Sequence, residues 1–297
     1  MVEDRLANLS PARRAALEAL LFQRRAARPT ERRIAARAGS GPAPLSYAQQ
    51  RLWFIDQLEP GSPLYNMPVA LRVEGPLRFE ALRLTLGEIV RRHEALRTVF
   101  AMSEGGEGSP VQVVQPAAPF ELPVVDLSGL PESRRETAAT ALAGEEAGRP
   151  FDLTRDLMLH CLLLRLAPSG EPADHVLALT MHHIASDAWS MGILVREVAA
   201  LYAVLSSEDT EGRPSPLPEL PVQYADFAVW QRSWLQGEAL ERELAYWRQQ
   251  LAGLPPLLEL PTDRPRPAVQ SYRGATRPVR LPAGLTGQME ALARREG

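Results

Sequence analysis

The sequence contains no lysine, so all 33 basic side chains are arginine. It has one cysteine, Cys161, which cannot form an internal disulfide and lies in the apolar run LMLHCLLLRL, where we expect a small buried residue. The first thirty residues have no uninterrupted apolar core of signal-peptide length, and we expect no stretch to span a membrane. These absences argue against secretion and membrane insertion, and they favour a reducing cytoplasm.

Charge is nearly balanced, with 36 acidic and 33 basic side chains and a net charge of -3. Such a balance disfavours a surface that attracts polyanions over the whole molecule, and we expect no nucleic-acid partner. Apolar residues make up 45% of the chain and charged residues 23%, as in folded proteins. With 297 residues, the chain is long enough for one large domain or two smaller ones.

The N-terminal region is predicted to be a helix followed by a basic linker. Residues 9–22 begin with Ser10 as a potential N-cap and Pro11 at the first helical position, and leucines form an apolar stripe. Segment 24–44 is rich in arginine and ends in glycine and proline, which favours a solvated linker. The alternative for residues 1–44 is a docking element for a partner protein.

The central region alternates between strand and helix patterns, which predicts an α/β sandwich. Ser46 and Gln49 form the pattern of a capping box at the start of a helix. We expect helices over 46–58, 76–100 and 131–148, and strands over 67–74, 111–115, 121–126, 157–166 and 174–181.

Proline-rich connectors over 213–221 and 255–267 separate the later elements. Residues 222–252 are predicted to form one long helix. Its aromatic residues recur at helical spacing, which favours a core stripe over a role in stacking on substrate. They are Tyr224, Phe227, Trp230 and Trp234. Residues 264–297 show only a weak strand signal and a fragment of helix.

The most informative residues are His182 and His183, at the end of the strand expected over 174–181, and Asp187 four positions later. Adjacent strand residues point to opposite faces, so the two imidazoles do not converge readily, and we expect no metal site. A histidine facing a cleft can accept a proton from an amine or orient it for attack. A buried histidine and an aspartate that caps a helix would give the same HHxxxD pattern, so the pattern alone also allows a purely structural role.

Four segments in order decide between these interpretations. They are SYAQQRLWFIDQL at 46–58, RHEALRTVF at 92–100, MHHIASDAWSM at 181–191 and YADFAVWQR at 224–232. Together they resemble the signature motifs of condensation domains of nonribosomal peptide synthetases, over about residues 45–260. The resemblance implies a fold like chloramphenicol acetyltransferase, with two lobes of two-layer α/β sandwich around a tunnel. Residues 45–212 would then form the N-terminal lobe, and 213–297 a connector and the start of a second, similar lobe.

The resemblance also implies roles for single residues. His183 matches the active-site histidine of the family and His182 its companion. Asp187 matches an aspartate regarded as structural through an ion pair with an arginine of the second motif, for which Arg92 is the first choice and Arg97 the second. Three residues after this aspartate are expected to lie along the substrate channel, namely Ala188, Trp189 and Ser190.

The implied reaction is amide bond formation. The amine of an acceptor aminoacyl thioester attacks a donor acyl thioester, and both are carried on 4′-phosphopantetheine arms of peptidyl carrier proteins. The domain itself is expected to bind no cofactor. Its expected partners are the donor and acceptor carriers, an adjacent adenylation domain and an upstream subunit that docks through residues 1–44.

The chain departs from the family pattern in three places. Ala188 replaces a glycine, which is strained if that position has positive φ and harmless if it is helical. His160 stands where arginine is common, as a variation of the surface or of lobe packing. The chain ends at Gly297 before the later motifs, so we expect about two-thirds of a domain and weak or no activity from this polypeptide alone.

Competing interpretations remain. Epimerisation domains share HHxxxD but differ in the following helix and in the second motif. Cyclisation domains replace the two histidines, and a stand-alone acyltransferase would not carry all four motifs. The alternative of a different class is a non-catalytic module that recruits carrier proteins.

Overall fold

The computed structural model describes residues 33–103, 108–168, 173–207, 215–268, 274 and 277–296. The chain divides into two compact units, Met1–Ala252 and Gly253–Gly297, each of which is described by itself. The helix expected over 9–22 and the segment 24–32 lie outside the described residues.

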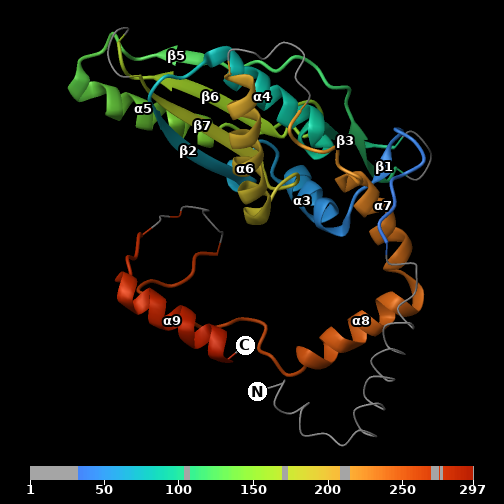
Figure 1. Cartoon of the computed structure of the whole chain (residues 1–297). Helices are drawn as coiled ribbons and strands as arrows, with labels where there is room; N and C mark the ends of the chain where they lie inside the picture. Colours follow the sequence, from blue (N-terminus) through green and yellow to red (C-terminus); the bar gives the residue numbers. More distant parts are fainter. Residues whose placement is uncertain are drawn as a thin grey trace, which may run out of the picture. The chain divides into compact units, whose positions relative to one another are not determined.

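A four-stranded sheet forms the centre of the first unit (Figure 1). Its strands are β2 (Asn66–Glu74), β5 (Val124–Asp126), β6 (Leu159–Arg165) and β7 (Asp174–His182), in the order β2-β7-β6-β5. β7 is antiparallel to both neighbours, and β5 runs parallel to β6. The last six residues of β7 are all buried, as an apolar central strand requires, so the sheet leads directly to His182.

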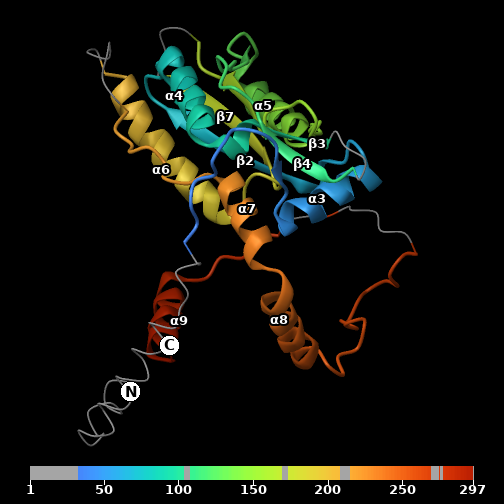
Figure 2. The same ribbon diagram turned by 90° about the vertical axis from the view of Figure 1, so that its right-hand side faces the viewer.

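Helices cover both faces of this sheet (Figures 1 and 2). α4 (Phe79–Arg92) and α6 (Ala188–Leu205) lie side by side on one face, where Leu82, Leu86 and Ile89 of α4 contact the strands. α5 (Glu132–Ala147) packs against the opposite face. The spacing of the buried positions in α4 produces this arrangement, because residues three and four apart share one side of a helix. The predicted α/β class is confirmed.

A smaller sheet lies beside the first one. It contains β1 (Ala43–Pro44), β3 (Thr98–Met102) and β4 (Pro110–Val114), in the order β1-β4-β3. α3 (Tyr47–Leu58) follows β1 and begins with the predicted capping box, in which Gln49 N donates to Ser46 Oγ at 3.1 Å and Ser46 N donates to Gln49 Oε1 at 3.0 Å. A core cluster that includes Leu52, Phe100 and Ile184 joins this region to the loop after β7.

Two predicted helices are wrong in extent. The helix expected over 76–100 ends at Arg92, because His93 has an extended backbone and a 3₁₀ turn (Glu94–Arg97) leads into β3. The helix expected over 222–252 is divided into α7 (Tyr224–Trp234) and α8 (Gly237–Gln250), and Gly237 at the junction has φ +54°. Glycine is the residue that adopts this conformation without strain.

The aromatic residues of α7 are half-buried and none of them is fully buried, so the expected core stripe is only partly confirmed. Its rings contact one another instead, and those of Trp230 and Trp234 stack at 5.3 Å between centroids. In the second unit, α9 (Ala283–Glu296) forms the helix expected near the end. The weak strand signal before it corresponds to no strand among the described residues of 264–296.

α6 is long and apolar enough to cross a membrane by length and composition, with 18 residues and a mean hydropathy of 1.5. The expectation that no stretch has these properties is therefore wrong for α6. Its Leu194 and Leu201 pack in the core of the sheet, and its Glu197 forms an ion pair with Arg92. Leu194 and Leu201 are the two buried residues of α6, and the absence of a membrane partner stays a prediction.

Candidate active site

Hydrogen bonds fix the backbone of His183, the first residue of the loop between β7 and α6. His183 N donates to the carbonyl of Tyr65 at 2.9 Å. Ala185 N and Ser186 Oγ both donate to the carbonyl of His182, at 3.0 and 3.2 Å. The backbone of His183 is therefore tied to the strand region on one side and to the loop on the other.

The ring of His183 is exposed, and its Nδ1 lies 2.7 Å from the carbonyl oxygen of Ser186. A carbonyl oxygen can only accept, so Nδ1 carries the proton. The neutral ring then has its lone pair on Nε2. An imidazole with this tautomer can accept a proton from an incoming group through Nε2.

His182 has the opposite environment. It is 3% exposed, its Nδ1 accepts a hydrogen bond from Ile184 N at 3.1 Å, and its ring meets Phe151 edge-on at 5.6 Å. Burial, and then the nearby charge of His183, lower the pKa of His182 to about 4. The ring is therefore neutral near pH 7 and serves to shape the loop.

Asp187 is the N-cap of α6. Its Oδ1 accepts hydrogen bonds from Ser190 N at 2.8 Å and from Ser190 Oγ at 2.6 Å. Its backbone N donates to Ser190 Oγ at 3.4 Å, which completes a capping box. These hydrogen bonds, and then the charge of His183, lower the pKa of the Asp187 carboxyl below its usual range. The carboxyl of Asp187 is therefore ionised near pH 7.

The predicted ion pair between Asp187 and an arginine is wrong. Within the described ranges, neither Arg92 nor Arg97 contacts Asp187. Arg92 donates from Nε to Glu197 at 3.1 Å and to the carbonyl of Pro218. The guanidinium of Arg97 donates to backbone carbonyls and faces a different carboxylate, that of Glu94. Both arginines thus donate to other acceptors, and the carboxylate of Asp187 accepts its hydrogen bonds from Ser190 of α6.

The three residues expected along the channel lie in the first turn of α6. Ala188 is the first helical residue, so its backbone has ordinary helical torsions and the strained alternative is excluded. Trp189 is 82% exposed. Ser190 turns its hydroxyl toward Asp187. Their contact with a substrate stays a prediction.

A cavity of about 320 Å³ adjoins this loop. Its walls come from the end of β7, the first three turns of α6, the 3₁₀ turn of the second motif and residues 220–224. At its polar end, Glu197 Oε2 lies 2.7 Å from His93 Nε2. The sequence interpretation missed Glu197, although an acidic residue in a largely apolar helix is a signal that could have found it.

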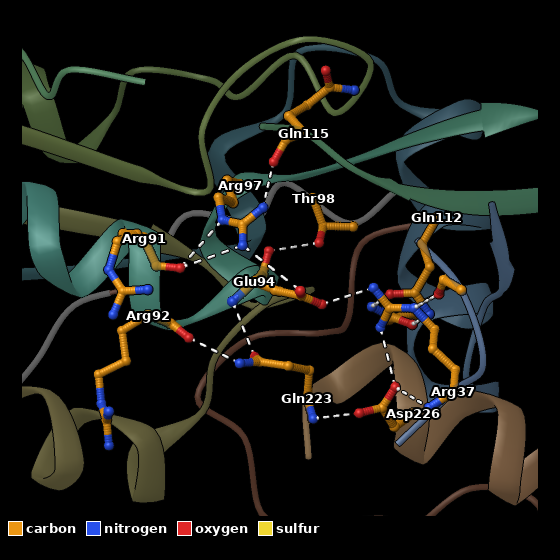
Figure 3. A network of polar contacts seen from close by, with 12 residues as sticks. Arg37, Arg91, Arg92, Glu94, Arg97, Thr98, Gln112, Gln115, Gln223 and Asp226 are labelled. Atoms are coloured by element: carbon orange, nitrogen blue, oxygen red, sulfur yellow. Dashed lines mark hydrogen bonds and ion pairs between the residues drawn. The ribbon is translucent and has the colours of Figure 1, made fainter. Parts of the chain in front are cut away.

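A partly buried polar network (Figure 3) includes Gln223, which lines this cavity. Gln223 donates from Nε2 to the carbonyl of Arg92 at 2.9 Å and accepts from Glu94 N at 3.1 Å. Its own backbone N donates to Asp226 Oδ2 at 2.7 Å. The second and fourth sequence motifs are therefore linked through Gln223, which precedes the fourth motif.

Arg37 completes the network from the N-terminal side (Figure 3). Its backbone N donates to Asp226 Oδ1 at 3.0 Å, and its guanidinium donates to Glu94 Oε2 at 2.8 Å. The expectation of a solvated linker is thus wrong at Arg37. The first motif is joined to the fourth as well, since Ser46 Oγ lies 3.0 Å from the hydroxyl of Tyr224.

His160 belongs to the core and not to the surface. Its ring stacks on Phe151 at 3.8 Å between centroids, and burial lowers its pKa to about 4. Of the two alternatives for this departure from the family pattern, only packing agrees with the structure.

Residues 40–297 match the family model described as Condensation domain. The chain belongs to the condensation-domain family. Over 254 residues, this condensation domain is 49% identical to one of the linear gramicidin synthase proteins of Brevibacillus parabrevis, a match that covers 86% of this chain and 3% of that protein. It is 46% identical over 296 residues to phosphinothricin tripeptide synthetase PhsC of Streptomyces viridochromogenes, over 100% of the chain and 26% of PhsC.

Solved structures agree with this family. The X-domain in its complex with OxyB from teicoplanin biosynthesis is 32% identical with a TM-score of 0.67, over 81% of this chain and 50% of its own. The first condensation domain of the calcium-dependent antibiotic synthetase is 26% identical with a TM-score of 0.60, over 72% of this chain and 48% of its own. The condensation domain therefore has the chloramphenicol acetyltransferase-like fold, and this chain spans about half of these structures and a small part of the curated relatives.

Proposed function

We propose that this condensation domain forms an amide bond between a donor acyl thioester and the amine of an acceptor aminoacyl thioester. The observation that carries the proposal is the exposed ring of His183, whose Nδ1 is tied to the carbonyl of Ser186 at 2.7 Å and whose Nε2 is left to meet a substrate. The family to which the chain belongs supports the same reaction.

In the proposed reaction, the acceptor nitrogen attacks the thioester carbonyl carbon and the carbon–sulfur bond breaks. His183 Nε2 takes the proton released by the nitrogen and returns it to the departing sulfur, so that the products are an amide on the acceptor and a free thiol on the donor arm. Asp187 caps α6 and so holds the end of the loop that presents His183. The N-terminus of α6 adds a positive partial charge near the developing oxyanion.

Most of the rate acceleration is expected from holding the amine and the carbonyl in reacting geometry. Both reactants would arrive on 4′-phosphopantetheine arms of peptidyl carrier proteins, with no cofactor bound by the domain itself. An adjacent adenylation domain, and an upstream subunit that docks through residues 1–44, complete the proposed set of partners. A cytoplasmic location, without nucleic-acid or membrane partners, belongs to the same proposal.

A non-catalytic recruiting module is the second candidate. The observation in its favour is that a domain with 32% identity and a TM-score of 0.67, the teicoplanin X-domain, was solved in complex with OxyB. In this alternative, the exposed first turn of α6 would contact a partner protein, and His183 would have no chemical role.

Replacing His183 tests both candidates. In the synthetase that carries this domain, His183→Ala is expected to lower the rate of dipeptide formation on the acceptor carrier by about 10²- to 10⁴-fold. The control is His175→Ala, near the far end of β7 from the site. Unchanged product formation by His183→Ala would favour the recruiting module, and inversion of a stereocentre without a new amide would favour an epimerisation domain.

A further inference from the structure

Helix α8 is apolar along one side, and yet none of its residues is buried. Its Leu240, Leu244 and Trp247 follow one another at spacings of four and three, which places them on the same side of the helix. Leu244 is 36% exposed and Trp247 is 56% exposed. A continuous apolar surface that is left exposed marks a place where another segment binds.

A groove of about 630 Å³ lies between this side of α8 and the C-terminal part of α7. Of the described residues that line it, Glu243 alone is charged, and all the others are tryptophan or leucine. On α8 the groove extends from Leu240 to Trp247, which corresponds to about 10 Å, or two turns of a helix. Its length and its lining therefore suit the apolar side of a second helix.

The N-terminal region of the sequence contains such a helix. Residues 9–22, which lie outside the described residues, are predicted to be helical, and Leu17, Leu20 and Leu21 form an apolar stripe at helical spacing. Arg13 and Arg14 precede this stripe and carry the charge opposite to that of Glu243. Amphipathic helices bind in this way, with the apolar side in an apolar groove.

The linker after this helix is long enough to reach the groove. At its far end, Arg37 N donates to Asp226 Oδ1 at 3.0 Å, in the first turn of α7. Residues 23–36 can extend over about 46 Å. Measured along α7, the turn after it and α8, Trp247 lies at most about 40 Å from Asp226. The whole groove is thus within reach of residues 9–22 of the same chain.

We propose that the helix expected over residues 9–22 packs into the groove between α7 and α8 of its own chain, with its leucines against Leu244 and Trp247. A tethered helix has a high effective concentration at the groove, so it outcompetes the same helix of a second copy. The inference does not depend on the proposed reaction. An upstream subunit would then meet a helix already bound to the domain, and not a free arm.

Hydrogen exchange of this chain, followed by mass spectrometry, tests the docking. The amides of residues 14–22 are expected to exchange at least about tenfold more slowly in the parent chain than in Leu244→Ser. The control is Tyr246→Ser, because Tyr246 is exposed on the same helix and does not line the groove. Its exchange should stay within about twofold of the parent chain. Thermal unfolding checks that both variants fold, and equal exchange in all three chains would overturn the inference.

A pair of introduced cysteines locates the helix. Cys161 is the only native cysteine, so Cys161→Ala provides a background without other thiols. In this background, Leu20→Cys with Leu244→Cys should form a disulfide within one chain at least about fivefold more than Leu20→Cys with Tyr246→Cys. Leu17→Cys in place of Leu20→Cys covers the other register of packing. Absence of the disulfide from both positions would contradict the proposal, and a disulfide between two chains would assign the groove to a second copy.

The same cysteine pair in the synthetase that carries this domain tests the remaining occupant. A disulfide at the same positions would support the inference for the whole protein. If the pair forms in this chain but not in the synthetase, another part of the synthetase fills the groove and the inference is wrong. Neither result bears on His183, whose replacement tests the proposed reaction separately.

Discussion

The side-chain hydrogen bonds that fix the imidazoles and Asp187 join residues two or three positions apart, whereas Arg37 and Asp226 in the partly buried network are 189 positions apart. The side chains of His183 and Asp187 are exposed and are held by near neighbours, while the network holds distant segments together. This difference separates two tasks. The loop presents a reactive group, and the network keeps the surrounding walls in register so that the loop faces a fixed space.

The largest effect on stability is expected from the network. Asp226 is 4% exposed and accepts from two backbone N–H groups and a guanidinium, so Asp226→Ala leaves buried donors unpaired. We expect the free energy of unfolding to fall by about 3–5 kcal/mol in urea titrations. Glu219→Gln, which breaks the exposed pair with Arg91, is the control and should cost less than about 1 kcal/mol. If the free energy of unfolding fell equally in the two variants, the network would not stabilise the fold more than an exposed ion pair does.

A smaller effect is expected from pH, through the buried member of the histidine pair. The pKa of His182 falls from 6.5 to about 4 on folding. Between pH 6.5 and about 4, the unfolded chain binds more protons than the folded one. The free energy of unfolding is therefore highest above pH 6.5 and falls as the pH is lowered toward 4. At pH 5, His182 alone should account for about 2 kcal/mol of the loss.

Replacing this ring checks the assignment. His182→Asn should flatten the dependence of the unfolding free energy on pH by up to about 1.4 kcal/mol per unit, while the remaining slope comes from groups such as His160. An identical slope in His182→Asn and the parent chain would mean that residue 182 is not the group that titrates.

The smallest effect is expected at the departure from the family pattern. Ala188 is exposed and begins α6, so Ala188→Gly should lower the unfolding free energy by less than about 1 kcal/mol. Thermal unfolding measures this change, and Ala200→Gly inside the same helix gives the reference for an interior position. A gain in stability at residue 188 would mean that alanine is strained there after all.

The sequence predicted the local part of the fold well, because local rules determine it. The capping box of Ser46 and Gln49, the strand leading to His182 and the cap at Asp187 all follow from neighbours within four positions. The partners of Arg92 could not be predicted in this way. They depend on which faces of α4 and α6 meet, and a guanidinium at the end of α4 reaches Glu197 and not Asp187 only because of that packing.

The helix ends show the same limit. Nothing in the apolar spacing after Arg92 distinguishes a continued helix from a turn, and β3 exists because β4 pairs with it. Likewise, the aromatic residues of α7 have core-like spacing, but burial depends on a covering surface that spacing does not supply. Gln223 could be recognised only from the structure, because its partners Arg92 and Glu94 lie 131 and 129 positions away in the sequence.

The 82% exposure of Trp189, two residues after Asp187, gives the domain an internal optical probe. An indole in water emits at long wavelength, and its emission moves toward the blue when another surface covers it. Comparing the spectra of the parent chain and of Trp189→Phe would isolate this signal from the other tryptophans. The arrival of a carrier arm or of a protein at the mouth of the site could then be timed in solution without any added label.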